Sequence, residues 1–230
     1  KEVGQVVPDK KVDSVCPYCG VGCLLTYNIK DDKILYAEGR DGPANMSRLC
    51  VKGRYGFNYV NSDQRLTVPL ARKKGVSKDI NPEDFDLNNV ENYFEPISWD
   101  EAIKRTTEKF KSLVMDDSRS TAGFGCAKGS NEEAYLFQKL VRTGFRNNNV
   151  DHCTRLCHAS SVVALLEMIG SGAVSNQVAD VAEADTIIVI GANPTVNHPV
   201  AATFIKNASK AGKNLIVLDP RKNDLARLAT

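Results

Sequence analysis

Short runs of alternating apolar and polar residues fill the first part of the chain. Leu24–Ile29 and Lys33–Ala37 have the composition of strands, and Lys30-Asp31-Asp32 separates them, which predicts a hairpin. The pattern from Val12 to about Leu70 therefore predicts a small β-rich module. Residues Arg72–Glu95 are polar and have no clear period, so they are predicted to form a connecting loop.

Helical periodicity begins after this loop. Ser98 is a candidate N-cap with Glu101 three residues later, and the apolar residues that follow lie close to a helical period. A second helix is predicted from about Asn131 to Arg146, and a third from about Thr154 to Ile169.

The last part of the chain reads as strand, helix and strand. Thr186–Ile190 is a continuous apolar, β-branched run, a helix is predicted over Pro199–Lys210, and Leu215–Leu218 is a second apolar run. Such a βαβ unit has parallel strands, which are usually buried on both faces. The predicted fold class is α/β, in which a small β-rich module precedes a parallel-sheet, Rossmann-like domain.

Composition narrows the class of protein. The chain has 230 residues and a net charge of +2, which argues against a dedicated nucleic-acid surface. It has no apolar run of the ~18 residues that a membrane helix needs, and Lys1–Asp13 lacks the apolar middle of a signal peptide. A soluble, cytoplasmic protein is expected, with no membrane and no nucleic-acid partner.

Four of the seven cysteines are close together in the sequence, with the spacing Cys16-x2-Cys19-x3-Cys23-x26-Cys50. Three thiolates on one loop and a fourth from a distant turn suit the larger body of an iron–sulfur cluster, whereas structural zinc sites commonly use two separated pairs. Zinc and unligated core cysteines remain alternatives. Lys52 follows the fourth cysteine, either as a surface lysine or as a group that holds a polar partner against the cluster.

A second group of cysteines lies at the predicted start of the third helix. Cys153 or Cys157 in a first helical turn would lie in positive potential, which favours the thiolate. A small buried hydrophobe is the alternative for either residue. His158 is a candidate for a metal or acid–base role, and a core histidine is its alternative.

Polar residues follow both strands of the predicted βαβ unit. Gly191, Asn193 and Asn197 come after the first strand, and Asp219 and Arg221 come after the second. The Gly-x-Gly-x-x-Gly fingerprint of NAD-binding proteins is absent there. Ligands nevertheless bind beyond the carboxyl ends of parallel strands, so these residues are either nucleotide contacts or turn and cap residues.

Together these segments resemble a known family, the molybdopterin oxidoreductases that bind two pterin guanine dinucleotides. Within that family the sequence looks most similar to the alpha subunit of soluble, NAD-linked formate dehydrogenases. The resemblance extends from Val12 to Thr230. It is carried by the segments CPYCGVGC, LCVKGRYG, NNVDHCTRLCHASS, VIGANPTVNHP and DPRK.

The resemblance implies a role for each matching residue. The four clustered cysteines would bind [4Fe–4S], and Lys52 would connect that cluster electronically to one pterin. Cys157 would bind molybdenum or tungsten, with His158 beside it. Both residues, with Lys52, would be catalytic. Contacts to the dinucleotides would come from Lys128, Asn193, Asn197, Asp219 and Arg221.

The implied activity is oxidation of formate to CO2, with electrons leaving through the pterin, past Lys52, to the cluster. Residues 12–70 would form the cluster domain and residues 71–230 part of the dinucleotide-binding domain. Iron–sulfur or flavin subunits would accept the electrons. Catalytic subunits of this family run to many hundreds of residues, so the chain is expected to be their N-terminal part and inactive alone, with a formate-binding arginine beyond Thr230. A nitrate reductase and a non-catalytic iron–sulfur subunit like that of respiratory complex I are the rival interpretations.

Overall fold

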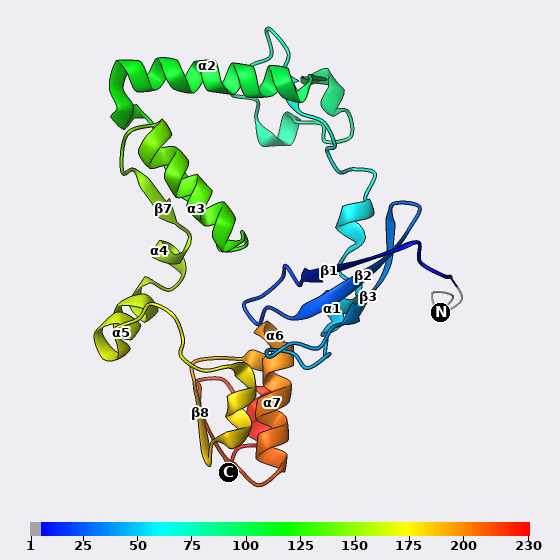
Figure 1. Cartoon of the computed structure of the whole chain (residues 1–230), viewed down its shortest axis with the longest axis vertical. Helices are drawn as coiled ribbons and strands as arrows, with labels where there is room; N and C mark the ends of the chain where they lie inside the picture. The colour runs from blue at the N-terminus through cyan, green and yellow to red at the C-terminus, as the bar shows by residue number, and fades with distance from the viewer. Residues whose placement is uncertain (1–5) are drawn as a thin grey trace. The chain divides into compact units, whose positions relative to one another are not determined.

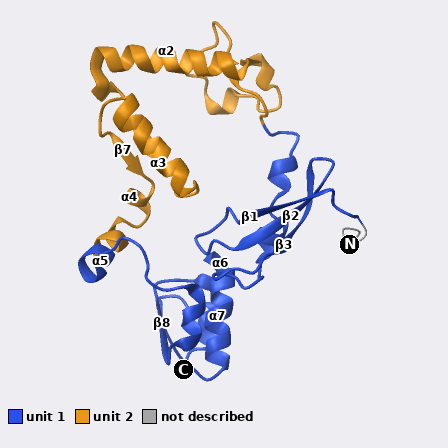
Figure 2. Ribbon diagram, viewed as in Figure 1, with its two compact units in different colours: residues 1–65, 165–230 blue, residues 66–164 orange. Residues whose placement is uncertain are grey.

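A computed structural model describes residues 6–230 (Figure 1). Two compact units divide the chain, one formed by residues up to Arg65 together with Leu165–Thr230, the other by Leu66–Ala164 (Figure 2). In residues 6–230 no helix has the length and apolar character needed to cross a membrane. The part of the signal-peptide prediction that rests on residues 1–5 lies outside the described residues.

The first unit begins with an antiparallel sheet of β1 (Lys10–Val15), β2 (Leu24–Lys30) and β3 (Lys33–Gly39), in that order. The predicted hairpin is confirmed, with Lys30 paired to Lys33 across the turn. Asp31 and Asp32 both have positive φ in this turn, as a tight two-residue hairpin requires.

The predicted βαβ unit is also confirmed. Strands β8 (Thr186–Ile190) and β9 (Asn214–Leu218) are parallel and in register, and α7 (Pro199–Lys210) connects them. The prediction that both faces of these strands are buried is wrong, however. Ile187 and Leu215 are buried, whereas Ile188 on the opposite face is 57% exposed, because α7 packs against one side of the two strands only.

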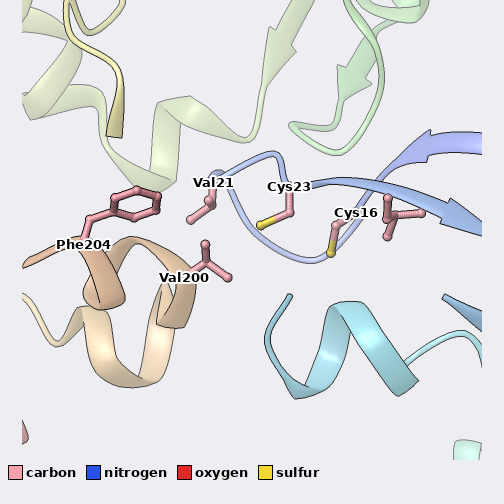
Figure 3. Close-up of a cluster of buried hydrophobic side chains, with 6 residues drawn as sticks. Cys16, Val21, Cys23, Val200 and Phe204 are labelled. Atoms are coloured by element: carbon pink, nitrogen blue, oxygen red, sulfur yellow. The ribbon is translucent and has the colours of Figure 1, made fainter. Parts of the chain in front are cut away.

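The first unit holds the cysteine loop against α7. Val200 and Phe204 of α7 form one buried cluster with Cys16, Val21 and Cys23 (Figure 3). A short helix α6 (Pro194–Asn197) precedes α7, and α1 (Val51–Tyr55) follows Cys50. This packing joins the β-rich module to the βαβ unit inside one compact body, although the two are more than a hundred residues apart in the sequence.

The second unit contains the predicted connecting loop and the first long helix. The loop is closed at its ends by a two-stranded sheet of β4 (Leu70–Arg72) and β5 (Phe94–Pro96). Helix α2 (Trp99–Asp117) begins as predicted, because the side chain of Ser98 accepts a hydrogen bond from the backbone N–H of Glu101.

A second parallel βαβ unit, which the pattern did not predict, lies in the same unit. Strands β6 (Gly123–Gly125) and β7 (Val150–His152) flank α3 (Asn131–Lys139). A π-helical turn extends α3 to Gly144, so the predicted second helix is confirmed to within two residues. The remaining short 3-10 helices are Asn58–Asn61, Pro82–Asp84, Val90–Asn92, Ser118–Ser120, Val178–Glu183 and Asp224–Arg227.

The predicted third helix is interrupted. Helix α4 (Thr154–Cys157) is a single turn, and α5 (Ala159–Ile169) begins after His158, whose backbone leaves the helical region at φ −151° and ψ 39°. Cys157 is therefore the last residue of a single-turn helix and does not lie at the start of a long one. The helix-dipole argument for a thiolate at Cys157 does not apply to α4.

Candidate cofactor site

The loop between β1 and β2 carries three of the four clustered cysteines. The backbone N–H of Cys16 donates to the carbonyl of Cys23 at 2.9 Å, which closes the loop at its base. Gly22 has φ +66°, a conformation that favours glycine and lets the chain turn back toward β2. Cys16 and Cys23 are buried, and Figure 3 shows both side chains on the inner side of the loop.

The fourth cysteine is brought in by a buried asparagine that sequence reasoning missed. Asn45 is fully buried, and its side-chain oxygen accepts from the backbone N–H of Leu24 at 3.1 Å. Its amide group donates to the carbonyls of Leu24, Arg40 and Arg48 at 3.0 to 3.1 Å. These bonds fix the start of β2 next to the segment that leads into Cys50. No pattern in the sequence distinguished this asparagine from an ordinary turn residue.

The four cysteines line one cavity with a volume of about 760 Å³. All are free thiols, and Lys52 is in the same wall. Within residues 6–230 no three His, Cys, Asp or Glu side chains are arranged to hold a single metal ion. Soft donors spread around a common cavity fit the larger body of an iron–sulfur cluster better than one zinc ion.

The thiols of this cavity affect one another. The pKa of Cys23 is raised to about 11, mainly by burial and in addition by the nearby Cys16, Cys19 and Cys50. Burial is also the main reason that the pKa of Cys16 is raised. Bound iron would offset this penalty, because metal ligation requires thiolates and supplies the positive charge that stabilises them.

Tyr18, inside the three-cysteine loop, connects that loop to α1. Its hydroxyl donates to the carbonyl of Gly56, and its ring lies 5.7 Å from the ammonium nitrogen of Lys52. A Cβ atom at Gly56 would lie 2.6 Å from the Tyr18 hydroxyl, so glycine makes this approach possible. The aromatic residue in the cysteine motif was the available sequence signal for this contact.

The predicted nucleotide residues of the first unit lie at the carboxyl ends of β8 and β9. Gly191, with φ +58°, donates its backbone N–H to the carbonyl of Leu218 at 2.8 Å. The Asp219 carboxylate accepts from the backbone N–H of Arg221 at 2.7 Å, and Asn193 accepts from the hydroxyl of Thr195.

Helix α6 connects these strand ends to the cysteine cavity. Thr195, Val196 and Asn197, which form most of this helix, line the same cavity as the four cysteines. The structure therefore places two predicted groups, the cysteine set with Lys52 and the residues after β8, around adjoining parts of one unit.

The remaining predicted residues lie in the second unit. Cys157 and His158 are exposed, which argues against the alternatives of a buried hydrophobe and a core histidine. Lys128 is exposed in the loop between β6 and α3.

A cavity of about 540 Å³ lies at the carboxyl ends of β6 and β7. Gly125, Cys126, Gly129 and His152 are among the residues that line it, and sequence reasoning identified none of them as site residues. A Gly-rich loop between a strand and a helix N-terminus was the available signal.

Comparison with known proteins identifies both parts of the chain. Residues 9–62 match the family model of the molybdopterin oxidoreductase Fe4S4 domain, and residues 65–230 match the molybdopterin oxidoreductase model. The structure of acetylene hydratase from Pelobacter acetylenicus superposes with a TM-score of 0.75 at 21% identity, covering 96% of this chain and 28% of that protein. This likeness concerns the fold.

Curated relatives are more similar in sequence. The chain is 38% identical over 221 residues to the alpha subunit of F420-dependent formate dehydrogenase 2 from Methanococcus maripaludis, and 36% identical over 227 residues to formate dehydrogenase H from Escherichia coli. Each match covers 96% of this chain and 30% of the relative. On these matches the chain belongs to the molybdopterin oxidoreductase family, and its first part is the Fe4S4 domain of that family.

Proposed function

We propose that the chain forms part of the catalytic subunit of a formate dehydrogenase that uses molybdenum or tungsten. The observation that carries the proposal is that four free cysteines and Lys52 line one cavity. The relatives named as formate dehydrogenases, which match nearly all of this chain, support formate as the substrate.

In this proposal the cysteine cavity holds a [4Fe–4S] cluster that carries single electrons. Burial of two cysteine side chains and the hydrogen bond from Cys16 to Cys23 keep the ligands in place with little reorganisation. Lys52 of α1 lines the same cavity, and there its ammonium group can donate a hydrogen bond to a pterin. That contact would connect pterin and cluster.

The pterin guanine dinucleotides would bind beyond the carboxyl ends of the parallel strands. One site would use Gly191, Asn193, Asn197, Asp219 and Arg221, at the edge that α6 connects to the cysteine cavity. Lys128 would contact a dinucleotide from the loop before α3. Residues 12–70 would form the cluster domain, and residues 71–230 part of a Rossmann-like domain.

Cys157 would bind the metal centre, and His158 would act beside it. When bound, that centre supplies a two-electron acceptor, which suits formate because its C–H bond is not acidic enough for general-base chemistry. The Cys157 thiolate is a soft donor suited to such a metal. The imidazole of His158, next in the chain, would hold or exchange a proton near it.

The test uses the full-length subunit loaded with metal, because this chain spans 30% of the length of its relatives. We expect formate to reduce an artificial dye, and nitrate not to oxidise the reduced dye. Nitrate turnover without formate turnover would favour a nitrate reductase. A full-length protein that contains iron but neither molybdenum nor tungsten would favour a non-catalytic electron-transfer subunit.

A further inference from the structure

Two exposed cysteines, Cys153 and Cys157, lie one helical turn apart, at the N-cap and the last residue of α4. Cys153 precedes Thr154–Cys157, and the backbone N–H of Cys157 donates to the Cys153 carbonyl at 3.0 Å. The Cys153 sulfur lies 3.9 Å from Nδ1 of His152. We propose that Cys153 and Cys157 form a modification site that a small-molecule disulfide, such as oxidised glutathione, converts to an intramolecular disulfide.

The distance between the two residues permits this bond. Residues four apart in an α-helix have Cα atoms about 6 Å apart, inside the ~4.4–6.8 Å range that disulfides span. Their Cβ atoms, about 5–6 Å apart in a regular helix, must approach by roughly 2 Å. A single-turn helix that already breaks at His158 can tighten locally without disturbing a longer helix.

His152 and Arg155 fix the turn that carries Cys153. Nδ1 of His152 accepts from the backbone N–H of Thr154 at 3.1 Å and lies 2.6 Å from the Thr154 hydroxyl oxygen. These contacts to Thr154 occupy the lone pair of Nδ1, so they hold the ring in place beside the Cys153 sulfur. On the other side of the turn, Arg155 is bound to Asp151 at 2.9 Å, which holds the segment in place.

The reaction has two balanced steps. The exposed Cys153 thiol loses its proton to solvent, and its sulfur attacks oxidised glutathione, forming a mixed disulfide and releasing one glutathione thiolate, which takes up a proton from solvent. The Cys157 sulfur then attacks the Cys153 sulfur, forming the intramolecular disulfide and releasing the second glutathione. Two protein thiols are oxidised, one glutathione disulfide is reduced to two thiols, and the two protons that the protein loses balance the two that the glutathiones take up.

The consequence for the enzyme rests on the proposed function of Cys157 as a metal ligand. A sulfur in a disulfide cannot bind the metal as a thiolate, so oxidation would block metal insertion and reduction would restore it. Bound metal would in turn protect Cys157 from glutathione. The disulfide itself depends only on the geometry of α4, so it can be tested without the metal.

The test uses this chain with its iron–sulfur cluster reconstituted, so that the four cluster cysteines are occupied, and without the pterin cofactor. The chain is treated with oxidised glutathione, alkylated and digested with trypsin without reduction. Arg155 lies between the two cysteines, so trypsin yields the separate peptides 147–155 and 156–206. We expect most of the 147–155 peptide to be linked to 156–206.

Two cysteine variants test whether the linked peptide comes from Cys153 and Cys157. Cys153→Ser should abolish the linked pair, whereas Cys126→Ser, which removes the third exposed cysteine of the second unit, should leave it unchanged. Separate glutathione adducts on Cys153 and Cys157 with no linked peptide would overturn the proposal, as would a link from either cysteine to Cys126. Failure of the cluster to form is seen independently from its absorbance, which separates failure of the proposed function from failure of this inference.

Discussion

At the residue scale, the structure separates two kinds of cysteine. Cys16 and Cys23 are buried in the wall of a shared cavity, whereas Cys153 and Cys157 are exposed on a single helical turn. The spacing alone predicted that the first group binds a cluster, because three close cysteines and one remote cysteine favour an iron–sulfur cluster over a zinc site. The second group lies beside a helix break at His158, which no periodicity marked.

Cys157→Ser in the full-length subunit should abolish formate-dependent dye reduction while iron content stays nearly unchanged. A serine hydroxyl is a hard, weakly ionised donor that does not replace a thiolate on molybdenum or tungsten. Because Cys157 is exposed in this structure, its replacement should have little effect on stability. Activity per metal-loaded enzyme and a melting curve give the two readouts. Full activity with a lowered melting temperature would contradict the metal-ligand role.

Tyr18→Phe should weaken the connection between the cysteine loop and α1. The variant keeps the ring beside Lys52 but removes the hydroxyl that donates to Gly56. Loss of one partly buried hydrogen bond costs about 1 kcal/mol, so an iron chelator should remove the cluster several-fold faster. Tyr55→Phe is the matched control, since Tyr55 is on the same helix with its side chain exposed. Equal rates for the two variants would show that the Tyr18 hydroxyl does not hold the site together.

At the element scale, Asn45 joins β2 to the segment before Cys50. Asn45→Ala should lower the free energy of unfolding by roughly 2–4 kcal/mol, because a buried donor and acceptor set is lost and several backbone groups stay unpaired. Cluster formation should fall with it.

Asn61→Ala serves as the control for this measurement. Asn61 also bonds to a strand, through the backbone N–H and carbonyl of Ile34, but it is half-buried and distant in sequence from the cysteine loop. Denaturant unfolding and iron content of both variants are compared. If Asn61→Ala reduced iron content as much as Asn45→Ala, Asn45 would have no special role in placing Cys50.

Strand β1 is held to its neighbours by a carboxylate whose effect depends on pH. The hydrogen bond from the Thr26 hydroxyl lowers the pKa of Asp13 below 3.8, and the Arg40 guanidinium lowers it further. A lowered pKa contributes stability above 3.8 that is lost as the pH falls through the folded-state value. Asp13→Asn should therefore be less stable than the unaltered chain at neutral pH and equally stable in strong acid. A stability difference that stays constant with pH would contradict this.

The elements were predicted unequally from sequence, for physical reasons. The β2–β3 hairpin and the β8–α7–β9 unit have strong local patterns and were found almost to the residue. Strands β6 and β7 are three residues each, too short for any period to show, so the second βαβ unit was missed. Burial of β8 and β9 on both faces was wrong because it depends on what covers the second face, which local sequence does not encode.

At the scale of the whole molecule, the proposed functional groups fall into two units. The cysteine cavity, Lys52 and the residues after β8 and β9 belong to the first unit, and Cys157 with His158 to the second. The first unit is assembled from segments at both ends of the sequence, packed through Val200 and Phe204 against the cysteine loop. Segments from both ends of the sequence line the proposed cluster cavity, so we expect a chain truncated before α7 to lose the cluster.

The most direct test of the account is the iron and acid-labile sulfide content of this chain after anaerobic reconstitution. We expect about four irons and four sulfides per chain, with visible thiolate-to-iron absorbance that dithionite bleaches. Cys50→Ala should lose this cluster and Cys126→Ser should keep it, because only the first residue lines the four-cysteine cavity. Tight binding of one zinc per chain, without sulfide and without a reducible chromophore, would contradict the central claim that these four cysteines bind a [4Fe–4S] cluster.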